Sequence, residues 1–471
     1  MLRLPFPVGI MPLVFPNADR SPRQRFMFWA LVGFLACCFA FGGSSRVDVF
    51  QPMLVRSAAV LLIAASIGTG APKDWSAVRV PALLLAAAAA VVALQLIPLP
   101  PALWTSLPGR SSVRTVADVI GSTQPWRPIS LTPDLTLNTL LSLLPPAAIL
   151  VGIASIARED RMRLLSVILV GGGVSVVIGL VQITSRDLYF FRITNPGYPV
   201  GVFANRNHQA ALVACMLPML GVFAGLRQGA RAGAKLQAAF AAVAAIALLP
   251  FVLANGSRAG LGLAIAGLAA GLILYAGHQG AWSSLTRSRA WRLSAGAAAL
   301  AGVVLVGAAA LYSRNDAITR ISSATTAEDQ RFQFIPQMTH MTADFFPVGS
   351  GFGSFDSVFR SYEPSEALLR TYFNHAHNDA LELAIEAGAF GFIVLTVLLG
   401  WWATRAAHYW RDMSRDSSAR RFGRLGSVVI GILFVASLVD YPLRTPLLGC
   451  IFFVAACWMH LEPTGRTQKT D

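Results

Sequence analysis

The stretch Asn374-His375-Ala376-His377-Asn378-Asp379 marks the point where the one long polar segment of the chain ends and an apolar run, residues 380–402, begins. A run of this length is enough for a helix that crosses a bilayer, which takes about 20 apolar residues. The six residues therefore lie at the mouth of a predicted membrane helix. Because histidine accepts and returns protons near neutral pH, the two histidines point to chemistry at a bilayer surface.

The composition of the whole chain fits a membrane protein. Of its 471 residues, 55% are hydrophobic and 13% are charged, whereas an ordinary soluble domain carries about 25% charged residues. We predict an all-α fold, a polytopic membrane bundle of about 12 transmembrane helices with a small helical cap. The predicted spans cover residues 27–42, 52–70, 80–97, 136–156, 164–183, 209–226, 237–254, 259–277, 294–312, 380–402, 425–440 and 446–460.

The distribution of Lys and Arg predicts the orientation, since cytoplasmic loops carry an excess of both. With the amino terminus inside, the inner segments are roughly twice as basic per residue as the outer ones. The net charge of +15 is then mainly a topology signal, with membrane lipids rather than nucleic acid as its partner. The chain divides into cytoplasmic tails at 1–26 and 461–471, helices one to nine over 27–312, a large outer loop at 313–376 and helices ten to twelve over 377–460.

Within the outer loop, Phe334, Met338, Met341 and Phe345 recur at helical spacing and predict an amphipathic helix. Its apolar stripe has two possible partners, the bilayer surface or the core of the bundle. A glycine-rich turn, 347–353, ends the helix. It lacks the Lys-Ser/Thr of a phosphate-binding loop, so a nucleotide site is disfavoured.

The next helix is expected to begin at Asn378 or Asp379, either of which is a good N-cap. His377 then stands at the positive end of a helix dipole, which disfavours the imidazolium and favours a bound anion. We take His377 as the candidate base and His375 as its competitor. Glu382 and Glu386 lie one turn apart; they either orient a histidine or bind sugar hydroxyls, or else pair with an arginine inside the bundle.

Three arginines of the predicted outer face complete the constellation. Arg206 follows Asn205 and precedes Asn207 just before a span, Arg258 occupies a tight turn between two spans, and Arg331 opens the amphipathic helix. A charge beside hydrocarbon is costly unless it is paired or reaches the headgroups, so such residues are functional candidates. Arginine forks suit a diphosphate. Snorkelling to the headgroups is the alternative, especially for Arg258.

These residues resemble the bacterial O-antigen ligase and O-antigen polymerase superfamily, integral membrane glycosyltransferases that use undecaprenyl-diphosphate-linked glycans. The family pattern of His, Asn, nine residues, Gly, two residues and Gly is met by His377, Asn378, Gly388 and Gly391. The Phe-x-Asn-Arg-Asn element at 203–207, the Ser-Arg-x-Gly element at 257–260 and Arg331 match in order. The resemblance covers about residues 135–460. It departs where an aromatic residue is usual a turn after Arg331, since Ile335-Pro336 stands there.

The resemblance implies a GT-C-like membrane enzyme whose active site lies on the periplasmic face of the bacterial inner membrane. His377 would deprotonate an acceptor hydroxyl, and Arg206, Arg258 and Arg331 would neutralise the departing diphosphate, giving inversion at the anomeric carbon. Supporting roles fall to Asn205, Asn207, His375, Asn378, Asp379, Glu382 and Glu386. No cofactor and no metal site is expected, because the chain has no Asp-x-Asp motif and its five cysteines all lie in predicted spans.

The acceptor is open at this point. Lipid A core as acceptor would make the protein an O-antigen ligase, another lipid-linked glycan would make it a polysaccharide polymerase, and a pilin would make it a protein glycosyltransferase. A transporter or flippase of lipid-linked sugars is an alternative of a different class. Transporters commonly show repeated halves with broken helices that meet at the midplane, whereas the polar residues here gather on one face, which favours the enzyme.

Overall fold

The computed structural model describes residues 20–185, 188–227, 232–278, 333–365, 373–411 and 417–461. This part of the chain is mostly helical and has almost no sheet, which confirms the all-α class. The described strands are β1 (Pro98–Leu99) and β2 (Arg127–Pro128), which pair antiparallel with Pro98 opposite Pro128. Their pairing closes a loop of the chain that contains two short helices, α4 (Pro101–Ser106) and α5 (Ser111–Val119).

Eight helices in the described ranges are long and apolar enough to cross a membrane. Each follows a predicted span closely, because runs of Leu, Val, Ile and Ala favour a helix whose backbone satisfies its own hydrogen bonds. They are α1 (Pro22–Phe41), α2 (Gln51–Gly68), the span Pro133–Ala154 made of α6 (Pro133–Leu141) and α7 (Leu144–Ala154), α8 (Arg158–Ser185), α9 (Arg206–Ala224), α10 (Ala232–Asn255), α11 (Arg258–His278) and α18 (Asp379–Trp410).

Three further predicted spans are helices that are too short or too polar to be counted among these eight. α3 (Arg79–Leu94) and α20 (Pro446–Trp458) are shorter than a membrane crossing needs. α19 (Ser418–Ser437) begins with Arg420, Arg421 and Arg424 in its first two turns, which makes that end polar. The ninth predicted span, 294–312, lies outside the described residues. The count of about 12 therefore stays a prediction.

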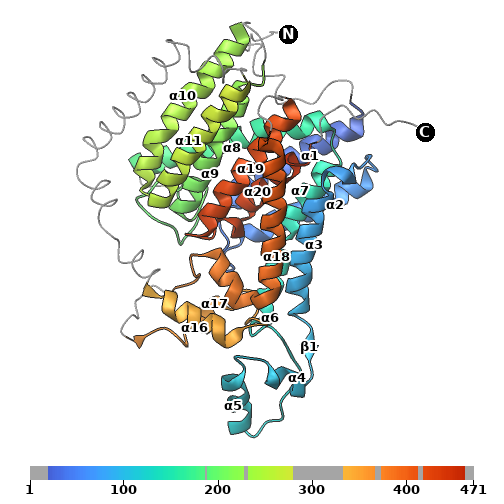
Figure 1. Cartoon of the computed structure of the whole chain (residues 1–471), viewed down its shortest axis with the longest axis vertical. Coiled ribbons are helices and arrows are strands. Elements are labelled where there is room, and N and C mark those ends of the chain that lie inside the picture. Colours follow the sequence, from blue (N-terminus) through green and yellow to red (C-terminus); the bar gives the residue numbers. More distant parts are fainter. Residues whose placement is uncertain are drawn as a thin grey trace.

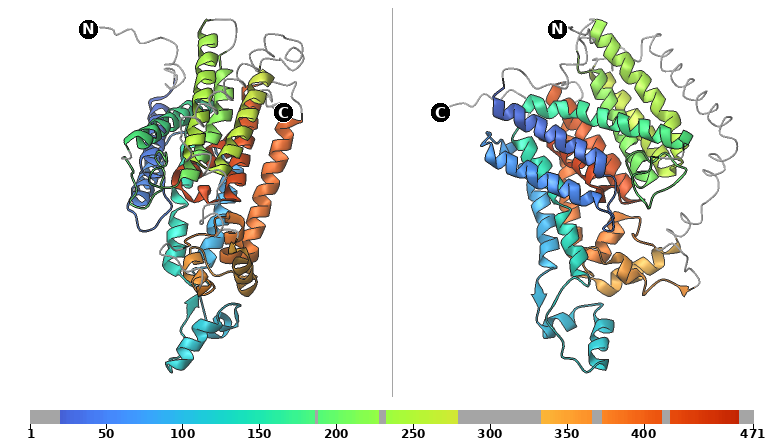
Figure 2. Two further views of the ribbon diagram at one scale, coloured as in Figure 1. Left: turned by 90° about the vertical axis from the view of Figure 1, so that its left-hand side faces the viewer. Right: turned by 180° about the vertical axis from the view of Figure 1, so that it is seen from behind.

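The helix α9 is the most enclosed of the eight candidate spans. Of the 18-residue apolar stretch of α9, 89% is buried, against 28–44% of the corresponding stretches in the other seven candidates. α9 packs against α8, α10, α11 and α19 (Figure 2). A helix that is apolar on every side is expected to be enclosed in this way. The amino-terminal end of α9, with Asn205 as N-cap, lies beside the end of α10, where the Asn255 side-chain amide donates to the Arg206 carbonyl (3.0 Å).

Two groups of short helices lie together at one end of the bundle (Figure 1). The cap segment, residues 333–365, contains α16 (Ile335–Phe345) and α17 (Phe355–Phe359). The α4–α5 unit, residues 98–132, lies beyond it. Met338, Met341 and Phe345 of the predicted stripe are buried in an aromatic cluster with Phe355 and Phe359. The stripe is thus part of a core. Of the two partners that the sequence left open, the bilayer surface and a protein core, the structure shows the core.

The glycine-rich turn of the cap segment is fastened to α18. The N–H of Ser350 donates to the Ile385 carbonyl (2.9 Å) and the N–H of Gly351 to the Glu386 carbonyl (2.9 Å). α18 is broken at Gly388, which has φ +53° and ψ −138°, so that the Ala389 N–H donates to the Pro347 carbonyl (2.9 Å) instead of within the helix. Two N–H groups of the turn are consequently hydrogen-bonded to carbonyls of α18, and the turn has a structural role. We call these contacts between the turn and α18 the clamp.

Replacing Gly388 with alanine is expected to destabilise the fold by about 2 kcal/mol or more, because the residue would be held at a positive φ that side chains disfavour. A Cβ atom there would also overlap the Pro347 carbonyl oxygen. Thermal unfolding in detergent measures the effect. Gly400→Ala, on the same helix with open space around it, is the matched control. Equal stability of the two variants would contradict the clamp.

Candidate active site

A histidine and a carboxylate from distant parts of the sequence meet at the start of α18. His377 Nδ1 lies 3.2 Å from Asp440 Oδ1. His377 belongs to the bent segment just before α18, and Asp440 belongs to the short loop between α19 and η4, a 3₁₀ turn at Pro442–Arg444. His377 has φ +49°, an uncommon conformation for a side-chain-bearing residue, and such conformations cluster at functional sites.

Asp440 is buried and receives several hydrogen bonds. Its Oδ2 accepts from the side-chain amides of Asn205 (3.2 Å) and Asn207 (2.6 Å), and its Oδ1 accepts from the Tyr441 N–H (3.0 Å). Burial by itself would raise the pKa of the Asp440 carboxyl, but the adjacent His208 and His377 outweigh it and hold that pKa well below its usual range. Asp440 is therefore an anion at neutral pH, and it is well placed to orient His377.

A pocket of about 780 Å³ opens beside this pair. Its polar wall contains Asn207, Arg258, His377 and Asn378, and its apolar wall consists of side chains from α16, α18 and the end of α19. The volume falls within the range of roughly 300–1,000 Å³ typical of ligand sites. The apolar lining residues are Ala259, Ile335, Met338, Ala376, Ala380, Leu381, Ala384, Phe392, Leu438 and Val439.

Three helices begin at the polar wall. Asn207 lies in the first turn of α9, Arg258 is the first residue of α11, and Asn378 caps α18 by accepting a hydrogen bond from the Leu381 N–H (3.1 Å). Each helix start carries a partial positive charge of about half a unit. Together with the Arg258 guanidinium they make this wall favourable for an anion.

His375 faces a different environment from His377. Its Nδ1 lies 2.8 Å from Glu382 Oε1, and it lines a second pocket of about 270 Å³ with Asn374 and Arg444. The two histidines on either side of Ala376 thus line separate pockets. Only His377 lines the large pocket, and this supports its choice over His375 as the candidate base.

Arg444 of η4 binds the three carboxylates at the start of α18. Its Nε donates to Asp379 Oδ1 (2.9 Å), and one guanidinium nitrogen lies 3.1 Å from Glu382 Oε1 and 3.7 Å from Glu386 Oε2. Glu382 and Glu386 are both almost completely buried. The pairing with a bundle arginine, one of the alternatives stated for these glutamates, is what the structure shows. Glu382 also contacts His375, so it orients that histidine as well.

Replacing Arg444 with methionine is expected to destabilise the protein by about 3 kcal/mol, because Glu382 would lose its main counter-charge while remaining buried. The second change Glu382→Gln should restore part of the loss by removing the unpaired charge. Thermal unfolding in detergent compares both variants with Arg114→Met, a change at an exposed arginine of α5. A melting temperature of Arg444→Met equal to that of the control would contradict the pairing.

Of the other two predicted arginines, Arg206 does not line the pocket and Arg331 is not among the described residues. Arg206 is the first residue of α9, and its guanidinium lies over the Tyr198 ring, 4.3 Å from the centroid. Its backbone carbonyl accepts from Asn255 (3.0 Å), next to the turn that carries Arg258.

Sequence reasoning missed Asp440, Tyr441 and Arg444. The Tyr441 ring lies between histidines, 4.2 Å from the His375 ring centroid and 5.1 Å from that of His377. Asp440 is the last residue of the predicted span 425–440, and Tyr441 and Arg444 lie between that span and the next one, 446–460. A carboxylate, a phenol and a guanidinium within five residues, between two apolar runs on the predicted outer face, were a signal that could have marked this loop.

Fold and site together define a multi-pass helical membrane protein with a histidine–carboxylate pair beside a pocket, which the histidine lines, at one end of its bundle. Residues 242–396, about a third of the chain, match the family model described as O-antigen ligase. This match supports membership of the O-antigen ligase and polymerase superfamily, and it indicates a membrane glycosyltransferase. The matched region contains Arg258, His377, Gly388 and Gly391. No curated protein matches the chain.

Proposed function

We propose that this chain is an inverting, metal-independent glycosyltransferase that moves a glycan from undecaprenyl diphosphate to an acceptor hydroxyl on the periplasmic face of the inner membrane. The observation that carries the proposal is the contact between His377 and the buried Asp440 at the wall of a pocket that also contains Arg258. Lipid-linked substrates suit this pocket because one wall is polar and the other apolar.

The base in this reaction is His377. Asp440 accepts the Nδ1–H, which fixes the tautomer and leaves Nε2 to take a proton. The acceptor hydroxyl gives its proton to Nε2, and its oxygen attacks the anomeric carbon of the donor sugar. The bond from that carbon to the diphosphate oxygen breaks, and the lipid diphosphate leaves. One displacement of this kind inverts the anomeric configuration.

The leaving diphosphate is assigned to the three helix starts and to Arg258. Helix N-termini and a guanidinium stabilise negative charge as it develops on the leaving oxygen. Arg206, beside the same turn, and Arg331 are assigned to this group as well. The prenyl chain is assigned to the apolar wall, where Phe392 and Leu438 are exposed on the side of the bundle.

A transfer assay with purified protein in lipid nanodiscs tests the proposal. The lipid-linked glycan and the acceptor are extracted from the producing bacterium. We expect a glycosidic product with inverted anomeric configuration by NMR, and an unchanged rate in EDTA. Retention of configuration, or loss of activity in EDTA, would contradict the mechanism. Movement of lipid-linked glycan across proteoliposomes without a new glycosidic bond would indicate the transporter alternative.

A deletion strain distinguishes the possible acceptors. Single lipid-linked repeats accumulate if the protein is a polymerase, and long polymer stays on the lipid carrier if it is a ligase. Loss of sugar from a pilin would indicate a protein glycosyltransferase. In each case the lipid-linked glycan is the donor and the reaction chemistry is the same.

Replacing Arg258 with lysine is expected to lower transfer about tenfold or more, because lysine keeps the charge but loses the planar fork that matches a diphosphate. Initial rates at several concentrations of lipid-linked donor measure the effect, and we expect the donor KM to rise. Arg114→Lys is the control. A rate equal to wild type would indicate that Arg258 only reaches for lipid headgroups.

A further inference from the structure

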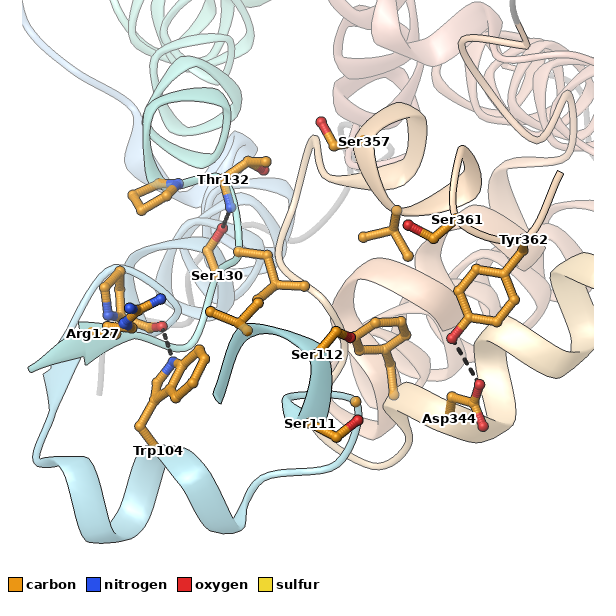
Figure 3. Close-up of a pocket in the computed structure, with 17 residues that line it drawn as sticks. Trp104, Ser111, Ser112, Arg127, Ser130, Thr132, Asp344, Ser357, Ser361 and Tyr362 are labelled. Carbon is orange, nitrogen blue, oxygen red and sulfur yellow. Dashed lines mark hydrogen bonds between the residues drawn. The ribbon is translucent and has the colours of Figure 1, made fainter. Parts of the chain in front are cut away.

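A second large pocket lies where the α4–α5 unit meets the cap segment (Figure 3). Its volume is about 840 Å³. It is lined by residues of segments 104–113 and 127–133, which are near each other in the sequence, and of the distant segment 344–362. α16 contributes to both large pockets, since Thr339 and Thr342 line the His377 pocket while Asp344 and Phe345 line this one. The two pockets are therefore neighbours on one rigid helix.

The walls of this pocket are held in place by a buried arginine. Arg110 is 1% exposed; it donates to the carbonyls of Ile129 (2.6 Å) and Gly349 (3.0 Å), which joins the α4–α5 unit to the glycine-rich turn. The Leu131 N–H donates to the Ser350 carbonyl (2.9 Å) across the same junction. A buried charge is costly unless its donors are used. The fold thus maintains a preformed pocket between these two parts.

The chemistry of the pocket is that of hydroxyl groups. Ser111 and Ser112 of α5 are exposed on one side, and Ser357 and Ser361 of the cap segment are exposed on the other (Figure 3). Within the described ranges, no hydrogen bond from these four hydroxyls to another residue is recorded. A serine hydroxyl both donates and accepts, so the four present eight or more hydrogen-bonding positions to a ligand.

Charged groups of both signs complete the lining. Arg127 lies over the Trp104 ring, 5.1 Å from its centroid, and Asp344 accepts a hydrogen bond from the Tyr362 hydroxyl (2.7 Å). One guanidinium and one carboxylate balance each other, which disfavours a strongly anionic ligand such as a diphosphate. The polar lining likewise disfavours a lipid chain. A saccharide, with its many hydroxyls and little net charge, matches the set.

We propose that this pocket binds an oligosaccharide segment of the glycan chain, a few sugars away from the bond that forms at His377. The proposal rests on the proposed glycosyl transfer and adds a chain-binding subsite to it. It gives the α4–α5 unit a role in holding long glycans. The segment belongs either to the lipid-linked donor or to a glycan acceptor, which share the same chemistry.

Two pocket-filling variants test the subsite, one on each wall. Ser112→Trp and Ser361→Trp place a large ring at exposed positions where the fold has room, and Ser122→Trp, exposed on the same α4–α5 unit but outside the pocket, is the control. The probe is polysaccharide released by mild acid from the lipid carrier of the producing bacterium. Its binding to purified protein is measured by calorimetry in the His377→Asn background, so that no turnover is required.

We expect both filled variants to weaken polysaccharide binding at least tenfold while Ser122→Trp binds like the parent protein. Parent-like binding in both filled variants, or no saturable binding to the parent protein, would overturn the subsite. Because binding is measured without turnover, failure of the proposed transferase activity would be seen separately in the transfer assay.

Transfer assays in the wild-type background then identify the source of the segment. A rise in KM for long lipid-linked donor, with KM for a single repeat unchanged, assigns the subsite to the donor glycan. A rise in KM for a long acceptor assigns it to the acceptor. Unchanged KM values for long donor and long acceptor in both filled variants would contradict a role in the reaction.

Discussion

Replacing Asp440 with asparagine should lower the rate of glycan transfer roughly 10²- to 10⁴-fold, while the protein still inserts in the membrane. Asp440 is ionised in the neutral range because its pKa is held well below its usual value, so the substitution removes a full charge at any assay pH near neutrality. The asparagine amide would also face the amides of Asn205 and Asn207, which donate to the present carboxylate. His377 would lose the acceptor that orients its ring.

The measurement is the initial rate of transfer by purified protein in nanodiscs, with the melting temperature recorded beside it. Asp118→Asn, at an exposed position of α5, is the control for loss of a carboxylate. A rate for Asp440→Asn within a few-fold of wild type would show that the carboxylate serves only to hold the loop.

Replacing His377 with asparagine should reduce transfer by about 10²- to 10⁴-fold, the contribution expected of a general base. Asparagine is chosen because it tolerates the positive φ of this position better than alanine does and cannot accept the proton. The fold should therefore be kept, with a melting temperature close to wild type. Product formation from lipid-linked glycan measures the loss.

Two other histidines provide the controls for this substitution. His408→Ala changes an exposed histidine at the far end of α18 and should leave the rate unchanged. His375→Ala removes the partner of Glu382, which Arg444 still binds, so we expect a smaller loss than for His377. Loss of activity in His375→Ala with retention in His377→Asn would reverse the assignment of the base.

Much of the fold could be predicted because hydrophobic runs and capping residues act locally. The run after Asp379 became α18, and Asn378 caps it as one of the two predicted residues. The stripe on α16 shows the limit of such reasoning. Periodicity states which side chains share a helix face, but the partner of that face depends on the aromatic residues of α17, which follow in the chain.

The site was predictable only in part, for a related reason. His377 was predicted from its place before a helix start and Arg258 from its place in a tight turn between two spans, and both line the same pocket. Asp440 lies 63 residues after His377, and the sequence places it at the edge of an apolar run, where a single carboxylate resembles the end of a span. Arg444 was equally hidden, although the glutamates of α18 called for a partner. Contacts of this range arise from helix packing, which local patterns do not encode.

The most direct measurement of the central claim is a double-mutant cycle on transfer rates with His377→Asn, Asp440→Asn and the double variant. If the two side chains act as one unit, each single change removes most of the catalysis and the double variant is no slower than His377→Asn alone. Losses that multiply in the double variant, or a His377→Asn rate near wild type, would contradict the claim that Asp440 acts through His377 as the base.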